Sequence, residues 1–218
     1  TKLSVYQSNR KMTFSNREGQ ISLNLRQNLK YLNTKAALRK EYRKRRDHLK
    51  EDQIADWSID ISNRCLTIDL WGYSLYHLFM TSEINKEVDT SYLLSILQGK
   101  DKQPVVPKML DDKGLKHFLL TDLITLKLNR FGVPEPLSGI LINPQQIEVV
   151  FVPLLIFDHQ GHRVGYGKGY YDRFLGECNR HTLKVGLSFF DPVSKIEDID
   201  TNDIALDYAV TPRETYAF

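Results

Sequence analysis

Four stretches of the chain have the apolar spacing or the composition of helices. In one of them, Ile54, Trp57, Ile61 and Cys65 recur every three or four positions, so they are expected to face the core. The stretch before it is rich in strong helix formers and contains neither glycine nor proline. The predicted helices cover residues 35–50, 52–68, 90–99 and 169–180.

Shorter apolar runs, rich in β-branched and aromatic residues, predict strands. The most apolar run, "IEVVFVPLLIFD" at 147–158, is typical of one central parallel strand, because both faces of such a strand are covered. The run "NRFGVPEP" at 129–136 contains a glycine and two prolines and is expected to be a loop. Alternating strands and helices predict a layered α/β sandwich with a mainly parallel central sheet. The other predicted strands cover residues 73–80, 103–109, 116–123, 182–190 and 207–212.

Residues 1–33 are polar and follow no sustained period. They are predicted to form an extension, with one short helix near 23–32, ahead of a single domain at 34–218. Hydrophobic residues make up 41% of the 218, which is enough for an ordinary domain core. The formal net charge of +3 is too small to indicate a coat for nucleic acid, and no apolar run reaches the roughly 18 residues of a membrane span.

Cysteine and histidine show no metal-binding pattern. Cys65 and Cys178 lie far apart and form neither a zinc motif nor a disulfide framework, so reduced thiols of a cytoplasmic protein are expected. The six histidines have no ligand spacing, and we expect each to lie at the surface or to be hydrogen-bonded within the protein. They are His48, His77, His117, His159, His162 and His181.

The stretch "GHRVGYGKGYYDR" at 161–173 contains four of the twelve glycines. It lies between a predicted strand and a predicted helix, an arrangement that binds phosphate through backbone amides at the helix start. Gly165, Gly167 and Gly169 alternate, and glycine lets the backbone approach a ligand closely. Lys168 adds a full positive charge. The alternative that stays open is a glycine-rich turn that only reverses the chain.

Asp172 follows this stretch, where a carboxylate beside bound phosphate is unfavourable unless a cation separates the two. Mg²⁺ prefers oxygen ligands and commonly bridges carboxylate and phosphate. Two other phosphate motifs fail on spacing: the P-loop needs a hydroxyl after Lys168, where Gly169 stands, and the dinucleotide fingerprint needs glycine in place of Tyr170.

The predicted helix at 35–50 carries a row of cations beside an apolar stripe formed by Leu38, Tyr42 and Leu49. The row falls within roughly 80° of arc, so the helix can dock on the core and hold cations at the edge of the contact. Such a row suits the phosphates of a polyanion; a solvent-exposed basic face and a nucleic-acid-binding helix are the alternatives. The row consists of Lys35, Arg39, Arg43 and Arg46.

Two segments, "KAALRKEYRKRR" and "VPLLIFDHQGHRVGYGKGYYDRFL", resemble the signature segments of the 5-formyltetrahydrofolate cyclo-ligase family. "EVDT", "GVPEP", "VGLSF" and "NDIALDYAVTP" match further family segments in the same order, so the resemblance covers about residues 34–212. The family converts 5-formyltetrahydrofolate and ATP to 5,10-methenyltetrahydrofolate, ADP and phosphate with Mg²⁺. Its fold is similar to that of sugar-phosphate isomerases and coenzyme A transferases.

The resemblance implies a role for particular residues. From the first segment, ATP contacts are implied for Lys35, Ala36, Ala37, Leu38 and Arg39. From the second, they are implied for Arg163, Val164, Gly165, Tyr166, Gly167, Lys168, Gly169, Tyr170 and Tyr171. Folate contacts are implied for Met80, Glu87, Tyr166, Gly167, Lys168, Gly169 and Tyr170. Metal contacts are implied for Asp172 and Asp203, and Lys168 and Arg39 are the expected catalytic residues.

Some residues depart from the family pattern. Leu154 and Ile156 stand where small residues are common, and we expect them to narrow or reshape the folate pocket. Asp191 and Pro192 stand where an acid followed by glutamine is expected. The partners expected are small molecules, with no nucleic acid and no membrane, and a monomer or weak dimer. A sugar-phosphate isomerase-like enzyme and a non-catalytic nucleotide- or nucleic-acid-binding module remain as alternatives.

Overall fold

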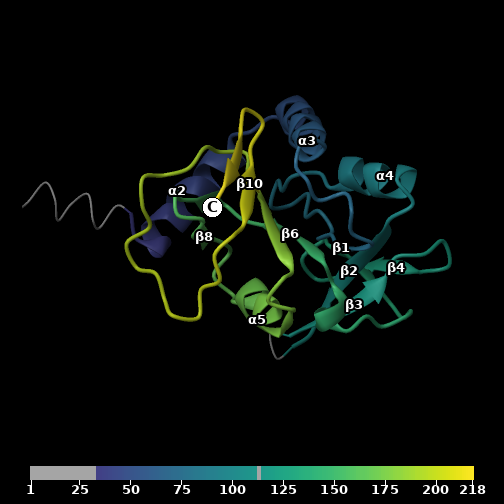
Figure 1. Ribbon diagram of the computed structural model, residues 1–218. Coiled ribbons are helices and arrows are strands. Elements are labelled where there is room, and N and C mark those ends of the chain that lie inside the picture. Colours follow the sequence, from purple (N-terminus) through teal and green to yellow (C-terminus); the bar gives the residue numbers. More distant parts are fainter. Residues whose placement is uncertain (1–32, 112–113) are drawn as a thin grey trace, which may run out of the picture.

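A seven-stranded sheet forms the centre of the computed structural model, which describes residues 33–111 and 114–218 (Figure 1). The strand order is β11-β10-β9-β6-β1-β2-β3, with the five inner strands parallel and both edge strands antiparallel to their neighbours. The predicted α/β fold with a mainly parallel sheet is therefore confirmed. The strands are β1 Leu75–His77, β2 Gln103–Met109, β3 Leu115–Leu119, β6 Val149–Pro153, β9 Leu183–Leu187, β10 Tyr208–Val210 and β11 Thr215–Ala217.

Helices cover both faces of this sheet (Figure 1). On β6, Val149 and Phe151 pack into the core layer beneath α3 and α4, whereas Val150 and Val152 pack beneath α5. Successive side chains of a strand point to opposite faces, so a strand covered on both sides is apolar throughout. The helices are α2 Lys35–Asp47, α3 Glu51–Cys65, α4 Ser91–Gly99 and α5 Tyr170–Glu177, with a 3-10 turn, η1, at Pro144–Gln146.

The long apolar run at 147–158 is two strands, so the prediction of one strand is wrong. After Pro153 the chain leaves the central sheet, and β7 (Ile156–Phe157) pairs antiparallel with β8 (Arg163–Val164). The backbone N–H of Leu155 donates to the Val164 carbonyl, 2.8 Å away, at the start of this hairpin. Both segments are apolar because both are buried, and hydropathy alone does not reveal the change of partner.

The segment at 129–136, predicted to be a loop, contains a strand. β4 (Leu126–Leu128) pairs antiparallel with β5 (Pro134–Pro136), and Lys127 lies opposite Glu135. Proline has no N–H to donate, which a strand tolerates in a small two-stranded hairpin. The prolines and the glycine therefore mark a strand with its turn and not an irregular loop.

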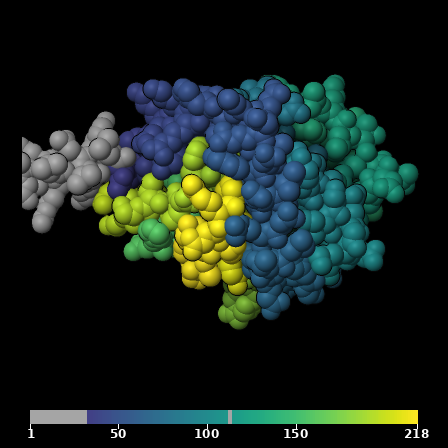
Figure 2. Space-filling model, turned by 90° about the horizontal axis from the view of Figure 1, so that it is seen from above, coloured from purple at the N-terminus to yellow at the C-terminus, as the bar shows by residue number. Residues whose placement is uncertain are grey.

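The N-terminal helix α2 and the C-terminal part of the chain lie at the same end of the molecule (Figure 2). The Ala37 N–H donates to Thr34 Oγ1 at 3.4 Å and caps α2, whose Leu38 and Tyr42 are buried. The predicted extension and its helix at 23–32 lie outside the described residues, apart from Asn33. In the described part of the chain, every helix is too short or too polar to cross a membrane.

Two histidines are buried under α5, contrary to the prediction that all six lie at the surface or are hydrogen-bonded. His77 is 0% exposed and His117 is 2% exposed. The centres of their rings lie 4.6 and 4.1 Å, respectively, from the centre of the Phe174 ring. Among the described residues, none of their four ring nitrogens has a hydrogen-bond partner. A single sequence marks histidine as polar and does not show that an aromatic helix face covers it.

This burial predicts a loss of stability in acid. Burial lowers the pKa of His117 to about 4, and burial together with His117 lowers that of His77 well below its usual value. As the pH falls, the unfolded chain binds protons at these histidines before the folded protein does. The free energy of unfolding therefore has its full value above about pH 6.5 and decreases as the pH falls towards 4, by up to about 1.4 kcal/mol per pH unit for each histidine. Urea unfolding across this range measures the slope. His117→Gln should flatten it, whereas the exposed His181→Gln should not; equal slopes would contradict the assignment.

Candidate active site

A cavity of about 430 Å³ lies at the carboxyl ends of three parallel strands. Met80 follows β1, Met109 ends β2 and Pro153 ends β6, and all three line the cavity. In α/β sheets, ligands bind at this edge because the loops that follow the strands diverge there. The sheet thus places the cavity where ligand-binding sites of this fold class form.

The glycine stretch forms one wall of the cavity. It connects β8 to α5, which confirms the predicted order of strand, glycine-rich loop and helix, although the strand is β8 and not the central one. Gly167 has φ 87° and Gly169, the residue before α5, has φ 74°. Residues with a Cβ rarely adopt this left-handed backbone, so glycine is favoured at both positions. This agrees with the expectation that the alternating glycines serve the conformation of the loop.

The cations of α2 lie against this loop. Arg39 donates from Nε to the Gly165 carbonyl at 2.9 Å, and Arg43 donates to the Tyr166 carbonyl at 3.2 Å. Together with Lys35, both arginines line the cavity. The arginines are directed at the loop, and this arrangement fits the interpretation that the row serves a ligand in the cavity.

Arg46, the fourth cation of the row, does not reach the cavity. Its side chain is turned inward and the residue is only 2% exposed. The expected row therefore supplies three cations to the cavity and one to the core behind it.

Most of the site residues expected from sequence line this one cavity. The exceptions are Ala36, Ala37 and Leu38 on α2. Leu38 is buried against Ile156 and Val164, since it belongs to the apolar stripe that docks the helix. Lys35 and Arg39, at the two ends of the segment 35–39, line the cavity, and the three residues between them do not.

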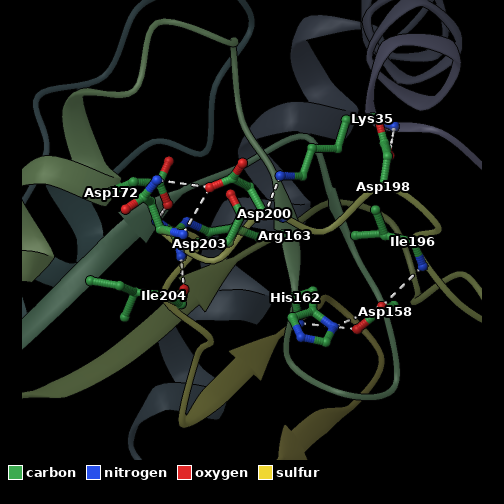
Figure 3. Close-up of polar contacts among 11 residues, drawn as sticks. Lys35, Asp158, His162, Arg163, Asp172, Ile196, Asp198, Asp200, Asp203 and Ile204 are labelled. Atoms are coloured by element: carbon green, nitrogen blue, oxygen red, sulfur yellow. Dashed lines mark hydrogen bonds and ion pairs between the residues drawn. The ribbon is translucent and has the colours of Figure 1, made fainter.

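The two acids expected to bind metal lie in a charged cluster (Figure 3). Asp172 accepts from Arg163 Nη2 at 2.5 Å, and Asp203 forms an ion pair with Lys35. Asp203 also accepts from the backbone N–H of Asp200 at 2.7 Å. Both carboxylates line the cavity, so each is held by a cation at the place where a ligand would enter.

A buried acid also lines the cavity. Glu87 is 8% exposed and accepts from the Ser82 backbone N–H at 2.9 Å. Burial raises the pKa of Glu87, and Arg46, the Ser82 N–H and the Tyr166 hydroxyl oppose this by stabilising the anion. An ionised carboxylate can accept several hydrogen bonds, so the lone pairs of Glu87 that the protein leaves free can accept from N–H groups of a ligand.

Several cavity residues were missed by sequence reasoning, and three of them belong to the β4–β5 hairpin. Phe131 is in its turn, and the Lys168 Nζ lies 3.8 Å from the centre of the Phe131 ring. The glycine and prolines of 129–136 were the available signal, but they located a turn and not what the turn faces. The missed lining residues include Met109, Phe131, Val133 and Glu135.

The departures from the family pattern lie outside the cavity, and the expectation that Leu154 and Ile156 narrow it is wrong. Leu154 is 1% exposed, and its Cδ2 lies 2.6 Å from where a Cβ on Gly186 would stand. Ile156 packs beneath α2. Asp191 pairs with Arg213 at 2.8 Å, also away from the cavity. These residues fill the core and the surface behind the site.

The fold and the cavity define an α/β protein in which a glycine loop, a cationic helix and a buried carboxylate line one cavity. A family model described as the 5-formyltetrahydrofolate cyclo-ligase family matches residues 32–212. The chain belongs to the 5-formyltetrahydrofolate cyclo-ligase family, as its sequence motifs predicted.

Individual relatives agree. The chain is 26% identical over 201 residues to a probable 5-formyltetrahydrofolate cyclo-ligase of Schizosaccharomyces pombe, covering 85% of this chain and 97% of that protein. The NMR structure of Aquifex aeolicus 5,10-methenyltetrahydrofolate synthetase superposes with a TM-score of 0.72 at 28% identity, covering 84% of this chain and 92% of the other. The synthetase of Mycoplasma pneumoniae, at 22% identity and a TM-score of 0.63 over 82% and 98% of the two chains, shares the fold.

Proposed function

We propose that this protein catalyses the ATP-dependent cyclisation of 5-formyltetrahydrofolate to 5,10-methenyltetrahydrofolate, with release of ADP and phosphate. The observation that carries the proposal is that α2, the glycine loop and Glu87 meet in one cavity, although they are distant in the sequence. The cations and the loop suit a triphosphate, and the compartment around Glu87 suits the N–H donors of a folate ring.

The chemistry needs positioning and charge neutralisation more than a protein nucleophile. The formyl oxygen attacks the γ-phosphorus of ATP, and the bond to the ADP oxygen breaks. N10 of the folate then attacks the activated formyl carbon and loses its proton, and the carbon–oxygen bond to phosphate breaks. In this proposal Lys168 stabilises charge on the transferred group, and Lys35 and Arg39 hold the phosphates.

The acids of the cavity fit Mg²⁺ bound together with a nucleotide. Mg²⁺ is commonly held by one or two carboxylates and by substrate phosphates, with water completing its coordination. Asp172 and Asp203 supply two such carboxylates, while the described residues contain no group of three protein ligands that would hold a metal alone. When bound, Mg²⁺ would neutralise phosphate charge; Asp172 and Asp203 would hold it.

The carboxylate of Asp172 should therefore set the Mg²⁺ requirement. Asp172→Asn is expected to raise the Mg²⁺ concentration for half-maximal rate about tenfold, because the amide lacks the negative charge. Asp56→Asn, on the exposed side of α3, is the control and should leave this concentration unchanged. A Mg²⁺ titration of the initial rate at saturating ATP measures both; equal requirements would remove Asp172 from the proposed metal site.

The proposed reaction involves only small-molecule partners. We place the protein in the cytoplasm as a monomer or weak dimer, with 34–218 as the catalytic domain and 1–33 as an appended extension. The alternatives are a sugar-phosphate isomerase-like enzyme, which works without ATP, and a binding module without catalysis.

One assay tests the proposal against both alternatives. The full chain is mixed with Mg²⁺, ATP and 5-formyltetrahydrofolate, and the absorbance of the methenyl product is followed. We expect product to form at the rate at which ADP appears, and to be absent when ATP is omitted. ADP release without product, or no turnover at all, would overturn the proposed function.

A further inference from the structure

Arg46 is a buried cation directly behind the cavity. Its Nη1 donates to the Tyr166 hydroxyl oxygen at 2.6 Å and its Nη2 donates to the Leu154 carbonyl at 2.7 Å. The guanidinium also lies over the rings of Phe189 and Tyr166, 5.7 and 6.0 Å from their centres. Within residues 33–111 and 114–218, its Nε has no hydrogen-bond partner.

Such a position is costly for stability. Moving a guanidinium out of water is unfavourable by several kcal/mol unless charges and hydrogen bonds compensate, and an apolar side chain of similar size is commonly at least as stable. A merely structural anchor for α2 would therefore not require arginine. A charged group retained there indicates that its charge acts on something nearby.

The neighbouring acid is Glu87. Arg46 and Glu87 attract each other, and the Tyr166 hydroxyl, which accepts a hydrogen bond from Arg46, also lies where it stabilises the Glu87 anion. A hydroxyl oxygen that accepts from a guanidinium keeps its own proton free for a neighbouring carboxylate. The three groups therefore form one polar network, in which Arg46 donates to Tyr166 and both stabilise the Glu87 anion.

Of these three groups, Tyr166 and Glu87 line the cavity, whereas Arg46 lies behind it. The ionisable groups that face Glu87 are Arg46 from α2, Tyr166 from the glycine loop and Tyr171 from α5. Arg46 is the one cation among them. Its removal would leave the Tyr166 hydroxyl and one backbone N–H to stabilise the buried carboxylate, since the Tyr171 hydroxyl has no hydrogen-bond partner among the described residues.

We propose that Arg46 is a positioning residue for the folate compartment: it fixes the Tyr166 ring and keeps Glu87 anionic, so that Glu87 accepts hydrogen bonds from the N–H groups of the substrate. The inference rests on the proposed function and adds a residue to it. Arg46 acts through its neighbours and does not touch ATP or folate. We therefore expect replacement of Arg46 to weaken binding of the folate and to leave binding of the nucleotide almost unchanged.

The test compares Arg46→Met with Arg45→Met. Arg45 is next to it on α2, but its side chain is about half exposed and pairs with Glu41, so it controls for loss of charge on the helix. For Arg46→Met we expect the KM for 5-formyltetrahydrofolate to rise about tenfold, with the KM for ATP changed less than twofold. The acidic limb of kcat/KM should move about one pH unit upward, because loss of a nearby cation raises the pKa of a carboxylate. Arg45→Met should change none of these.

Arg46→Lys covers the case in which the methionine variant does not fold. Lysine keeps the charge but not the forked geometry, so the melting temperature and the acidic limb should stay near those of the unmodified protein while the folate KM rises about threefold. Equal increases in both KM values, or an acidic limb that does not move in a folded methionine variant, would overturn the inference. An inactive unmodified protein would instead overturn the proposed function, which separates the two failures.

Discussion

Replacing Lys168 with alanine is expected to lower kcat by about a hundred- to a thousandfold while the protein stays folded. The Lys168 side chain is exposed and lies over Phe131, and within the described residues it forms no ion pair. By contrast, Lys35 and Arg163 are each paired with a carboxylate. Removing one group that stabilises developing charge typically costs this much in rate, whereas truncating an exposed side chain changes stability little.

The measurement is the initial rate of methenyl product at saturating substrates, together with the melting temperature. Lys195→Ala is the matched control, since Lys195 is also exposed, pairs with Glu197 at 3.5 Å and lies outside the cavity. It should keep a rate within about twofold of the unmodified protein. Turnover near normal in Lys168→Ala would exclude this lysine from the chemical step.

Gly167→Ala should lower kcat/KM for ATP by about a hundredfold. The φ of 87° disfavours any side chain, and a Cβ at this position would stand 3.0 Å from the Arg39 guanidinium carbon and Nε. Arg39 would have to move by a few tenths of an ångström and the loop would be strained at its positive φ, and misplaced groups in a site that works by positioning can cost this much. Glu87, which we propose binds the folate, keeps its hydrogen bond from the Ser82 N–H, so the KM for 5-formyltetrahydrofolate should change less than that for ATP.

Gly161→Ala separates the effect on the site from backbone strain. Gly161 also has a positive φ, of 80°, and its Cβ would stand 2.9 Å from the Leu206 carbonyl oxygen, but it does not line the cavity. Both variants should lose stability, as urea unfolding will show, and only Gly167→Ala should lose ATP efficiency. If the two lose it equally, the contact between Gly167 and Arg39 has no special role.

The sequence alone predicted the two segments that line the cavity, the glycine stretch and the cationic helix. Alternating glycines around Lys168, and cations every three or four residues from Lys35, are local patterns whose physical meaning needs no tertiary contact. The layered sheet followed in the same way, because a strand covered on both faces is apolar at every position, as "VVFV" at 149–152 shows.

Only the tertiary structure decided where each side chain points. Arg39 and Arg46 belong to the same basic row, but one lies against the glycine loop and the other is buried behind it. His77 and Leu154 likewise differ from expectation because of their packing partners. His77 packs against the Phe174 ring, and Leu154 fills the space beside Gly186 that a side chain would otherwise occupy. Periodicity assigns a residue to a face of its own element, whereas the partner of that face is set by segments more than a hundred residues away, such as Gly165 for Arg39.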